Sequence, residues 1–410
     1  MKLDLGLWYD VLESYSGTFP LKSYLSHLKC SNCGLHHSAE MPQSTCIQCG
    51  KMLYAQYDLD AASHAVSPSI LEGRPDTMWR YFEFLPVRDP SRIVTLGEGG
   101  TPLLRIKNLG RSLGCSNLYL KDEGLNPTGS FKARGLSAAV SRAVELGLSR
   151  LVAPSAGNAG GALAAYGARA GITTHIYMPE ETPVANKIEC ATYGATVTFV
   201  PGSIREAGQL ASKETRDQGY FDLSTLKEPY RLEGKKTMGY ELARANNWQS
   251  PDIIVYPTGG GTGLLGIWKA FEEMETLGWL REQKRPAMVC VQAEGCAPLV
   301  QAFQNHEEKS TPWENPHTIA SGLRVPSPFA DYEILKVLGV SGGTALTVTD
   351  SEMKEAGKDL GVQEGVCASP EGAATLAGLK KLLRSGTIDP ESTIVLLNTG
   401  TGLKYPDFLV

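Results

Sequence analysis

The sequence predicts an α/β fold in which parallel sheets are covered by helices. From residue 117 onward, short apolar runs alternate with longer amphipathic segments, which is typical of strands joined by helices. The chain has 410 residues, of which 42% are hydrophobic, enough for two or three domains with apolar cores. Its 44 glycines exceed the usual share of about 7% and indicate several tight turns or ligand-binding loops.

The elements follow from these runs. The expected strands lie at 117–121, 150–154, 174–178, 196–200, 252–257, 287–293, 344–348 and 393–398. The expected helices lie at 131–146, 158–170 and 183–193, after an earlier helix at 76–85 with Asp76 as its N-cap. Because ligands of such folds bind at the carboxyl ends of the strands, the residues after each strand are the candidate site.

Residues 1–60 differ from the rest, with no clear alternation of helices and strands. Two CxxC pairs, Cys30 with Cys33 and Cys46 with Cys49, have 12 residues between them, a spacing that suits tetrahedral zinc. Four thiolates leave no open position on the metal, so we expect a structural zinc ribbon and no catalytic one. Reduced thiols without a metal are the alternative.

Composition excludes several classes of function. The net charge of −5 gives little reason to expect a nucleic-acid partner. Acidic residues interrupt the start, MKLDLGLWYDVLESY, and no long apolar run follows, so we expect neither an export signal nor a membrane span. Nine cysteines, an odd number, argue against a disulfide framework. The sequence therefore predicts a soluble, cytoplasmic protein.

A lysine follows the first strand. In DEGLNPTGSFKARG (122–135), Asn126, Pro127 and Gly129 predict a turn, and Ser130 is expected to cap a helix that begins near Lys132. The positive end of the helix and nearby Arg134 are expected to lower the pKa of this lysine. Schiff-base chemistry with an aldehyde cofactor needs such an amine, although most lysines are simply solvated.

Two further turns suit anions. Ser155, Ala156, Gly157 and Asn158 open a helix of small residues whose first amides can bind a carboxylate. In PTGGGTGLLG (257–266), the glycines free the backbone to hold a phosphate at a helix N-terminus. The same loop matches the GxGxxG dinucleotide fingerprint, with Glu294 after the next strand, so an NAD-dependent oxidoreductase is a second hypothesis. After the last strand come Thr399, Gly400, Thr401 and Gly402, and a hydroxyl at this strand end can face a bound ring, although a simple glycine-rich exit turn is the alternative.

Together these strand ends match the needs of pyridoxal phosphate, and the motifs resemble the threonine synthase family of the tryptophan-synthase-β-like pyridoxal-phosphate fold. The matching segments span about residues 90–410 and are LGEGGTPLL (96–104), KDEGLNPTGSFKARG (121–135), SAGNAGGALAAYGARAG (155–171), PTGGGTG (257–263) and NTGTGLK (398–404). The resemblance implies two parallel-sheet α/β subdomains at 86–410, the smaller at about 130–240. The zinc-ribbon-like extension at 1–85 precedes them. A homodimer is also expected.

The resemblance also implies a role for each site residue. Lys132 bonds covalently to the cofactor aldehyde, Asn158 bonds the ring oxygen and Thr399 faces the ring nitrogen. The cofactor phosphate is held by Gly259, Gly260, Gly261, Thr262 and Gly263. Ser155, Ala156 and Gly157 take the substrate carboxylate, and Lys187 is a weaker candidate for the substrate phosphate. The implied reaction converts O-phospho-L-homoserine and water to L-threonine and phosphate.

Four site positions depart from the commoner family pattern, namely Ala133, Ala156, Ala159 and Thr401. They bear on the substrate more than on the cofactor. A related pyridoxal-phosphate enzyme therefore stays open: a threonine or serine dehydratase, an ammonia-lyase, or a β-replacement enzyme acting on phosphoserine. A third hypothesis, outside the enzymes, is a zinc-ribbon adaptor built on an inactive enzyme.

Overall fold

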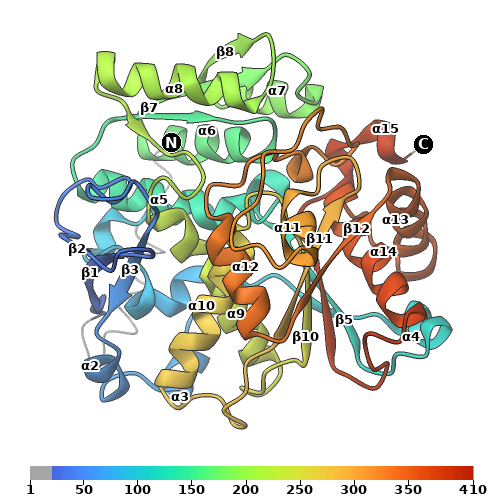
Figure 1. Cartoon of the computed structure of the whole chain (residues 1–410). Coiled ribbons are helices and arrows are strands. Elements are labelled where there is room, and N and C mark those ends of the chain that lie inside the picture. Colours follow the sequence, from blue (N-terminus) through green and yellow to red (C-terminus); the bar gives the residue numbers. More distant parts are fainter. Residues whose placement is uncertain (1–20, 410) are drawn as a thin grey trace, which may run out of the picture.

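The structure is a computed structural model that describes residues 21–409 and contains three sheets (Figure 1). Residues 1–20, which include the start inspected for an export signal and part of the predicted extension, lie outside the described residues. Within 21–409, no helix combines the length and apolar character that crossing a lipid bilayer requires.

The first sheet is small, antiparallel and built from the segment that holds the cysteine pairs. Its order is β2-β1-β3, with β1 (Leu25–Cys30), β2 (His36–His37) and β3 (Leu53–Tyr57). Side-chain hydrogen bonds tie this segment to the rest of the chain: Lys269 Nζ donates to the Ala55 carbonyl at 2.6 Å, and the Ser31 and Tyr332 hydroxyls lie 2.7 Å apart. Two short helices follow, α2 (Leu59–Ser63) and α3 (Pro68–Glu72).

The helix expected at 76–85 with Asp76 as its N-cap is wrong in type and start. The structure has a 3₁₀ helix at Met78–Phe84 that follows Thr77, with non-helical backbone at Tyr81. The backbone amide of Met78 donates to the Glu98 carbonyl at 2.9 Å. This segment therefore packs against the chain at 98–100, and that long-range contact is invisible in the local periodicity.

The largest sheet has six strands in the order β12-β11-β10-β13-β5-β4. Five are parallel, as predicted, whereas the edge strand β4 pairs antiparallel with β5. The strands are β4 (Leu103–Arg105), β5 (Leu118–Asp122), β10 (Ile253–Pro257), β11 (Ala287–Ala293), β12 (Thr344–Val348) and β13 (Ile394–Asn398). The accompanying helices are α4 (Lys107–Leu113), α9 (Tyr230–Ala245), α10 (Thr262–Thr276), α11 (Pro298–Gln304), α12 (Asp331–Val340), α13 (Asp350–Glu364), α14 (Pro370–Arg384) and α15 (Pro406–Leu409).

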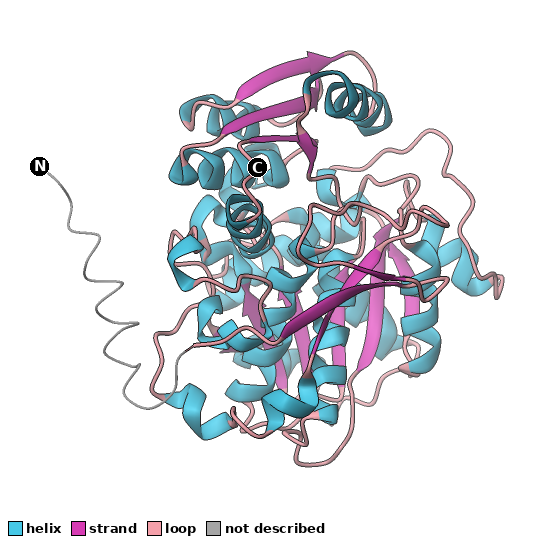
Figure 2. Ribbon diagram, turned by 90° about the vertical axis from the view of Figure 1, so that its left-hand side faces the viewer, coloured by secondary structure: helices cyan, strands magenta, loops and turns pink. Residues whose placement is uncertain are grey.

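A parallel sheet of four strands, in the order β8-β7-β6-β9, lies apart from the six-stranded sheet, at the top of both views (Figures 1 and 2). Its strands are β6 (Arg150–Pro154), β7 (Thr173–Pro179), β8 (Thr196–Val200) and β9 (Phe221–Asp222). The helices of this region are α5 (Lys132–Glu145), α6 (Asn158–Ala170), α7 (Val184–Thr192) and α8 (Ile204–Gln218). The two separate parallel sheets confirm the predicted α/β class.

Candidate active site

The carboxyl ends of β6, β10 and β13 and the start of α5 face one cavity of about 1290 Å³. Most of the residues singled out in the sequence line it: Lys132, Ser155, Ala156, Gly157, Asn158, Gly259, Gly260, Gly261, Thr262 and Thr399. Segments more than 260 residues apart in the chain thus meet at one place, as expected for strand ends of parallel sheets.

Lys132 is the first residue of α5 and is half-buried in this cavity. The turn before it contains Thr128 in the left-handed region at φ 60°, unusual for a β-branched residue. Burial, with a smaller contribution from the Arg231 guanidinium, lowers the pKa of Lys132 to about 8. A substantial fraction of this amine is therefore neutral at physiological pH, which a nucleophilic amine requires.

Two expectations about this turn are wrong. Ser130 does not cap α5; it forms an isolated bridge with Gly400, and the N-cap position falls to Phe131 without a side-chain bond. Arg134 does not lower the pKa of Lys132, because its guanidinium is neutralised by Glu123 and Glu241, each at 2.6 Å. Arg134 and Glu123, both in the motif at 121–135, thus form a buried ionic network with Glu241.

Glycines bring Arg231 beside Lys132. A Cβ at Gly135 of α5 would lie 2.8 Å from the Arg231 carbonyl oxygen, and one at Gly234 of α9 would lie 2.0 Å from the Arg134 carbonyl oxygen. The backbones of α5 and α9 therefore approach too closely for any side chain at these two positions. This approach places the cations of α9 next to the reactive amine.

The turn before α6 is organised by Ser155. Its hydroxyl accepts from the Gly160 amide at 2.8 Å and donates to the Gly157 carbonyl at 2.9 Å. The Ser155 side chain thus stabilises the turn itself, and the first amides of α6 are the groups that can bind an anion. Asn158 begins the helix and lines the cavity.

The glycine loop precedes α10 and admits only glycine at two of its positions. A Cβ at Gly259 would lie 2.1 Å from the Gly322 carbonyl oxygen, and one at Gly263 would lie 1.8 Å from the Tyr256 hydroxyl. Gly261 is in the left-handed region at φ 73°, where it serves as the N-cap position of α10. The loop therefore presents backbone amides at the N-terminus of a 15-residue helix, which suits a phosphate.

The turn after β13 packs on the lysine loop. The Phe131 amide donates to the Thr399 carbonyl at 3.1 Å, and the Thr401 amide donates to the Gly129 carbonyl at 2.9 Å. These bonds hold Thr399, which is 6% exposed, in the same cavity as Lys132. Thr399 thus brings a hydroxyl to the cavity at this strand end.

Two of the predicted residues lie off the cavity lining. Gly263 stands one residue into α10 and acts through close packing. The Lys187 amine donates to the Glu180 carbonyl at 2.5 Å and lies 5.3 Å from the centroid of the Phe199 ring. The structure therefore places Lys187 on α7, with its amine engaged away from the other predicted residues.

Sequence reasoning missed three residues that line the cavity: Lys235, Glu371 and Tyr405. Lys235 is buried, and its amine lies 5.0 Å from the centroid of the Phe131 ring, which Lys132 approaches at 4.1 Å. Within residues 21–409 it forms no ion pair. The i, i+4 spacing of Arg231 and Lys235 was the available signal, but such pairs usually face solvent.

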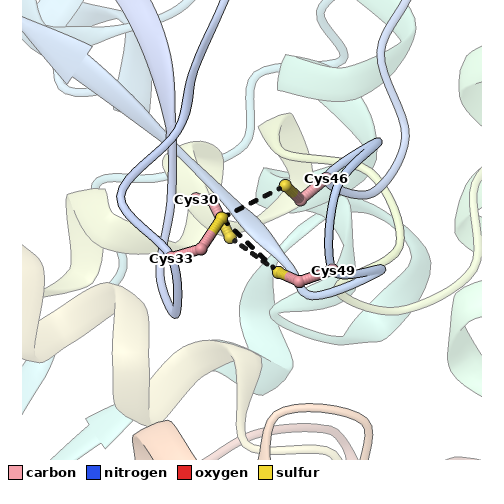
Figure 3. A group of neighbouring side chains, drawn as sticks. All are labelled: Cys30, Cys33, Cys46 and Cys49. Atoms are coloured by element: carbon pink, nitrogen blue, oxygen red, sulfur yellow. Dashed lines mark hydrogen bonds between the residues drawn. The ribbon is translucent and has the colours of Figure 1, made fainter.

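The four clustered cysteines form a second candidate site. Their sulfur atoms all lie within 4.8 Å of one another (Figure 3), and no other group of this kind is found within 21–409. The two CxxC pairs adopt the same kind of turn: the Gly34 amide donates to the Cys30 carbonyl, the Gly50 amide donates to the Cys46 carbonyl, and both glycines have positive φ. Cys49, Gly50 and Lys51 also line the cavity that holds Lys132.

Comparison with known proteins agrees with this geometry. The family model described as pyridoxal-phosphate dependent enzyme matches residues 94–400. The threonine synthase of Methanocaldococcus jannaschii is 41% identical over 92% of this chain and 93% of its own length. The threonine synthase of Methanosarcina acetivorans is 38% identical over 94% of this chain and 93% of its own length.

Solved structures show the same fold. The processed form of threonine deaminase isoform 2 from Solanum lycopersicum has a TM-score of 0.63 at 22% identity and covers 73% of this chain and 79% of its own. Membership of a pyridoxal-phosphate family removes the oxidoreductase hypothesis. The chain belongs to the threonine synthase family of pyridoxal-phosphate-dependent enzymes.

Proposed function

We propose that this chain converts O-phospho-L-homoserine and water to L-threonine and phosphate, with pyridoxal phosphate bound at Lys132. The observation that carries the proposal is the half-buried Lys132 amine, with its pKa near 8, in one cavity with two helix N-termini that suit anions. The relatives support the reaction, since the curated threonine synthases align over nearly their whole length.

The residues present fit the cofactor. Gly259 and Gly263 let the loop backbone pack closely against Gly322 and Tyr256, and the loop residues Gly259, Gly260, Gly261 and Thr262 line the cavity at the N-terminus of α10, where backbone amides suit a phosphate. In the proposal this loop and Thr262 hold the cofactor phosphate, Asn158 donates to the ring oxygen, and Thr399 faces the ring nitrogen. A hydroxyl is a poor acid, so Thr399 leaves the ring nitrogen largely unprotonated.

Each residue then has a defined task. Pyridoxal phosphate, when bound, supplies a conjugated ring that accepts electrons from the substrate bonds that break. Lys132 would hold it through its amine, and this amine, when free, would move protons at Cα and Cβ of the substrate. The amides at 155–157 and the start of α6 bind the substrate carboxylate.

The substrate phosphate needs a cation. Lys187 stays a candidate, but its amine would first have to leave the Glu180 carbonyl. Lys235 is better placed, because it lines the cavity and is buried without an ion-pair partner among the described residues. A bound phosphate would neutralise this cation, whose burial otherwise costs free energy.

The test is turnover of O-phospho-L-homoserine by the purified protein, with phosphate and threonine measured together. Borohydride reduction followed by peptide mapping should find a pyridoxyl group on Lys132. The variant Lys132→Ala should lose both the adduct and the activity, whereas an inactive adaptor would keep its function. Release of ammonia and a keto acid would instead identify a dehydratase or ammonia-lyase, the alternative that Ala156 and Ala159 in the cavity lining keep open.

We also propose that Cys30, Cys33, Cys46 and Cys49 hold a structural zinc ion. Tetrahedral Zn–S bonds of about 2.3 Å place sulfur atoms about 3.8 Å apart. The Cys33–Cys46 and Cys33–Cys49 sulfur distances are 3.6 and 3.7 Å. Elemental analysis should find one zinc per chain, lost in Cys33→Ser and kept in Cys367→Ser, an exposed cysteine outside the cluster.

The boundaries 1–85 and 86–410, the homodimer and the cytoplasmic location stay predictions. Gel filtration coupled to light scattering would settle the oligomeric state. The proposed reaction, on a small-molecule substrate, does not depend on any of these three predictions.

A further inference from the structure

The side-chain amide of Asn158 is held by three neighbours. Its Oδ1 accepts from Asn186 Nδ2 and from Lys404 Nζ, each at 3.1 Å, and its Nδ2 donates to the Tyr405 hydroxyl at 3.3 Å. An ammonium group can only donate, so the atom that faces Lys404 must be the amide oxygen. The orientation of the amide is therefore determined, and one N–H of Nδ2 remains for another acceptor.

Tyr405 connects this amide to a carboxylate. Its ring is 6% exposed, and its hydroxyl lies 3.2 Å from Glu371 Oε1. A carboxylate only accepts, so the single proton of the hydroxyl points to Glu371 and its lone pair faces Asn158. Burial and the Glu371 charge raise the pKa of Tyr405 well above its usual value, so this proton stays in place.

Glu371 is itself fixed. Its Oε1 accepts from the Gly322 amide at 2.7 Å, and it stands in the first turn of α14, whose N-terminus favours a negative charge. The three residues thus form a chain of donors that runs in one direction, from Asn158 through Tyr405 to Glu371. Chains of this kind polarise their members and resist rotation of any one of them.

We propose that Tyr405 and Glu371 are positioning residues that aim the remaining N–H of Asn158 at the ring oxygen of pyridoxal phosphate. The inference rests on the proposed function, since it takes Asn158 as the ring-oxygen donor. Neither residue needs to touch the reacting atoms. Their effect reaches the cofactor through the orientation of one amide, which no sequence motif around Asn158 encodes.

The experiment uses the holoenzyme of Tyr405→Phe, which keeps the ring and removes the hydroxyl. We expect the dissociation constant of pyridoxal phosphate to rise about 2- to 10-fold, the effect of one hydrogen bond. The ratio of the two cofactor absorbance bands that report ionised and un-ionised ring oxygen should change in the same direction as in Asn158→Ala. A variant that only loosened packing would not reproduce that change.

Tyr81→Phe is the matched control, because it also removes a buried tyrosine hydroxyl, one that has no hydrogen-bond partner among residues 21–409 and lies outside the cavity. Glu371→Gln is the second variant if Tyr405→Phe does not fold, and it should move the band ratio in the same direction. Wild-type band ratios in both variants, or an equal shift in Tyr81→Phe, would overturn the inference. If the variants shift the band ratio as expected but the wild-type protein forms no threonine, the result would count against the proposed function alone.

Discussion

The lowered pKa of Lys132 predicts how fast the protein without cofactor takes up pyridoxal phosphate at each pH. Only the neutral amine attacks an aldehyde. A lysine with its ordinary pKa of 10.5 is about 0.03% neutral at pH 7, whereas one with a pKa of about 8 is about 10% neutral. The difference of about 2.5 between these two pKa values gives Lys132 a rate advantage of roughly 300-fold over an ordinary lysine at pH 7.

The assay follows the cofactor absorbance after mixing, with borohydride trapping and peptide mapping to confirm attachment at Lys132. Because burial favours the neutral form, the rate should rise with pH and level off above about 8. A solvent-exposed model amine under the same conditions should continue to rise towards pH 10. A protein profile that also rises to pH 10 would refute the reasoning, because it would mean that burial and the neighbouring cations do not perturb this amine.

Arg231→Gln separates the two causes. Burial contributes most to the shift and Arg231 less, so the variant should move the midpoint of the profile upwards but keep it below that of a free lysine. A midpoint that does not move would mean that Arg231 does not contribute to the shift. A midpoint equal to that of the model amine would contradict the order of the two causes.

Three further predictions concern stability and binding. Gly259→Ala should weaken pyridoxal phosphate binding in an absorbance titration and lower the free energy of unfolding by about 1–3 kcal/mol, because its Cβ meets a carbonyl oxygen. The control is Gly361→Ala, which lies on the exposed side of α13 with open space around it and should raise the free energy of unfolding by about 0.5–1 kcal/mol. Arg134→Met leaves buried Glu123 and Glu241 short of a cation and should cost about 3–5 kcal/mol in urea unfolding; no loss would mean that the network is not needed for folding. Lys235→Met should stabilise the protein at neutral pH by about 1–4 kcal/mol, because it replaces a buried cation, unpaired among the described residues, by an apolar side chain. Burial lowers the folded pKa of Lys235, so the unfolded state binds more protons and wild-type stability rises as the pH approaches 10.5, a rise that the variant should lack.

Local patterns predicted the strand positions well because most of these strands are short apolar runs, fully buried in β10 and β13, and the more exposed β8 keeps the alternation of a half-buried strand. The strands at 150–154, 196–200 and 287–293 and the helix at 158–170 have the expected bounds. The short antiparallel strand β4 was missed, since three residues carry no periodic signal. Most of the candidate site was predictable because strand ends converge in this fold class, whatever the intervening sequence.

What the sequence could not show are the contacts between distant segments. Arg134 was expected to act on Lys132 through proximity in sequence, yet its charge is taken up by Glu241, 107 residues away. Lys235 resembles any surface lysine of a helix until the close approach of α5 buries it. Tyr405 and Glu371 carry no motif, and their roles depend on a hydrogen bond across 34 positions.

The second cysteine turn bears on whether the N-terminal segment can be separated from the rest of this enzyme. Because Cys49, Gly50 and Lys51 form part of the wall around the reactive lysine, the N-terminal segment is not a detachable appendage. An oxidant or chelator that disturbs these thiols would change the wall of the cavity that a substrate enters, without contacting the cofactor. We therefore expect catalysis by this chain to respond to the redox and metal state of the cysteine segment at residues 30–51.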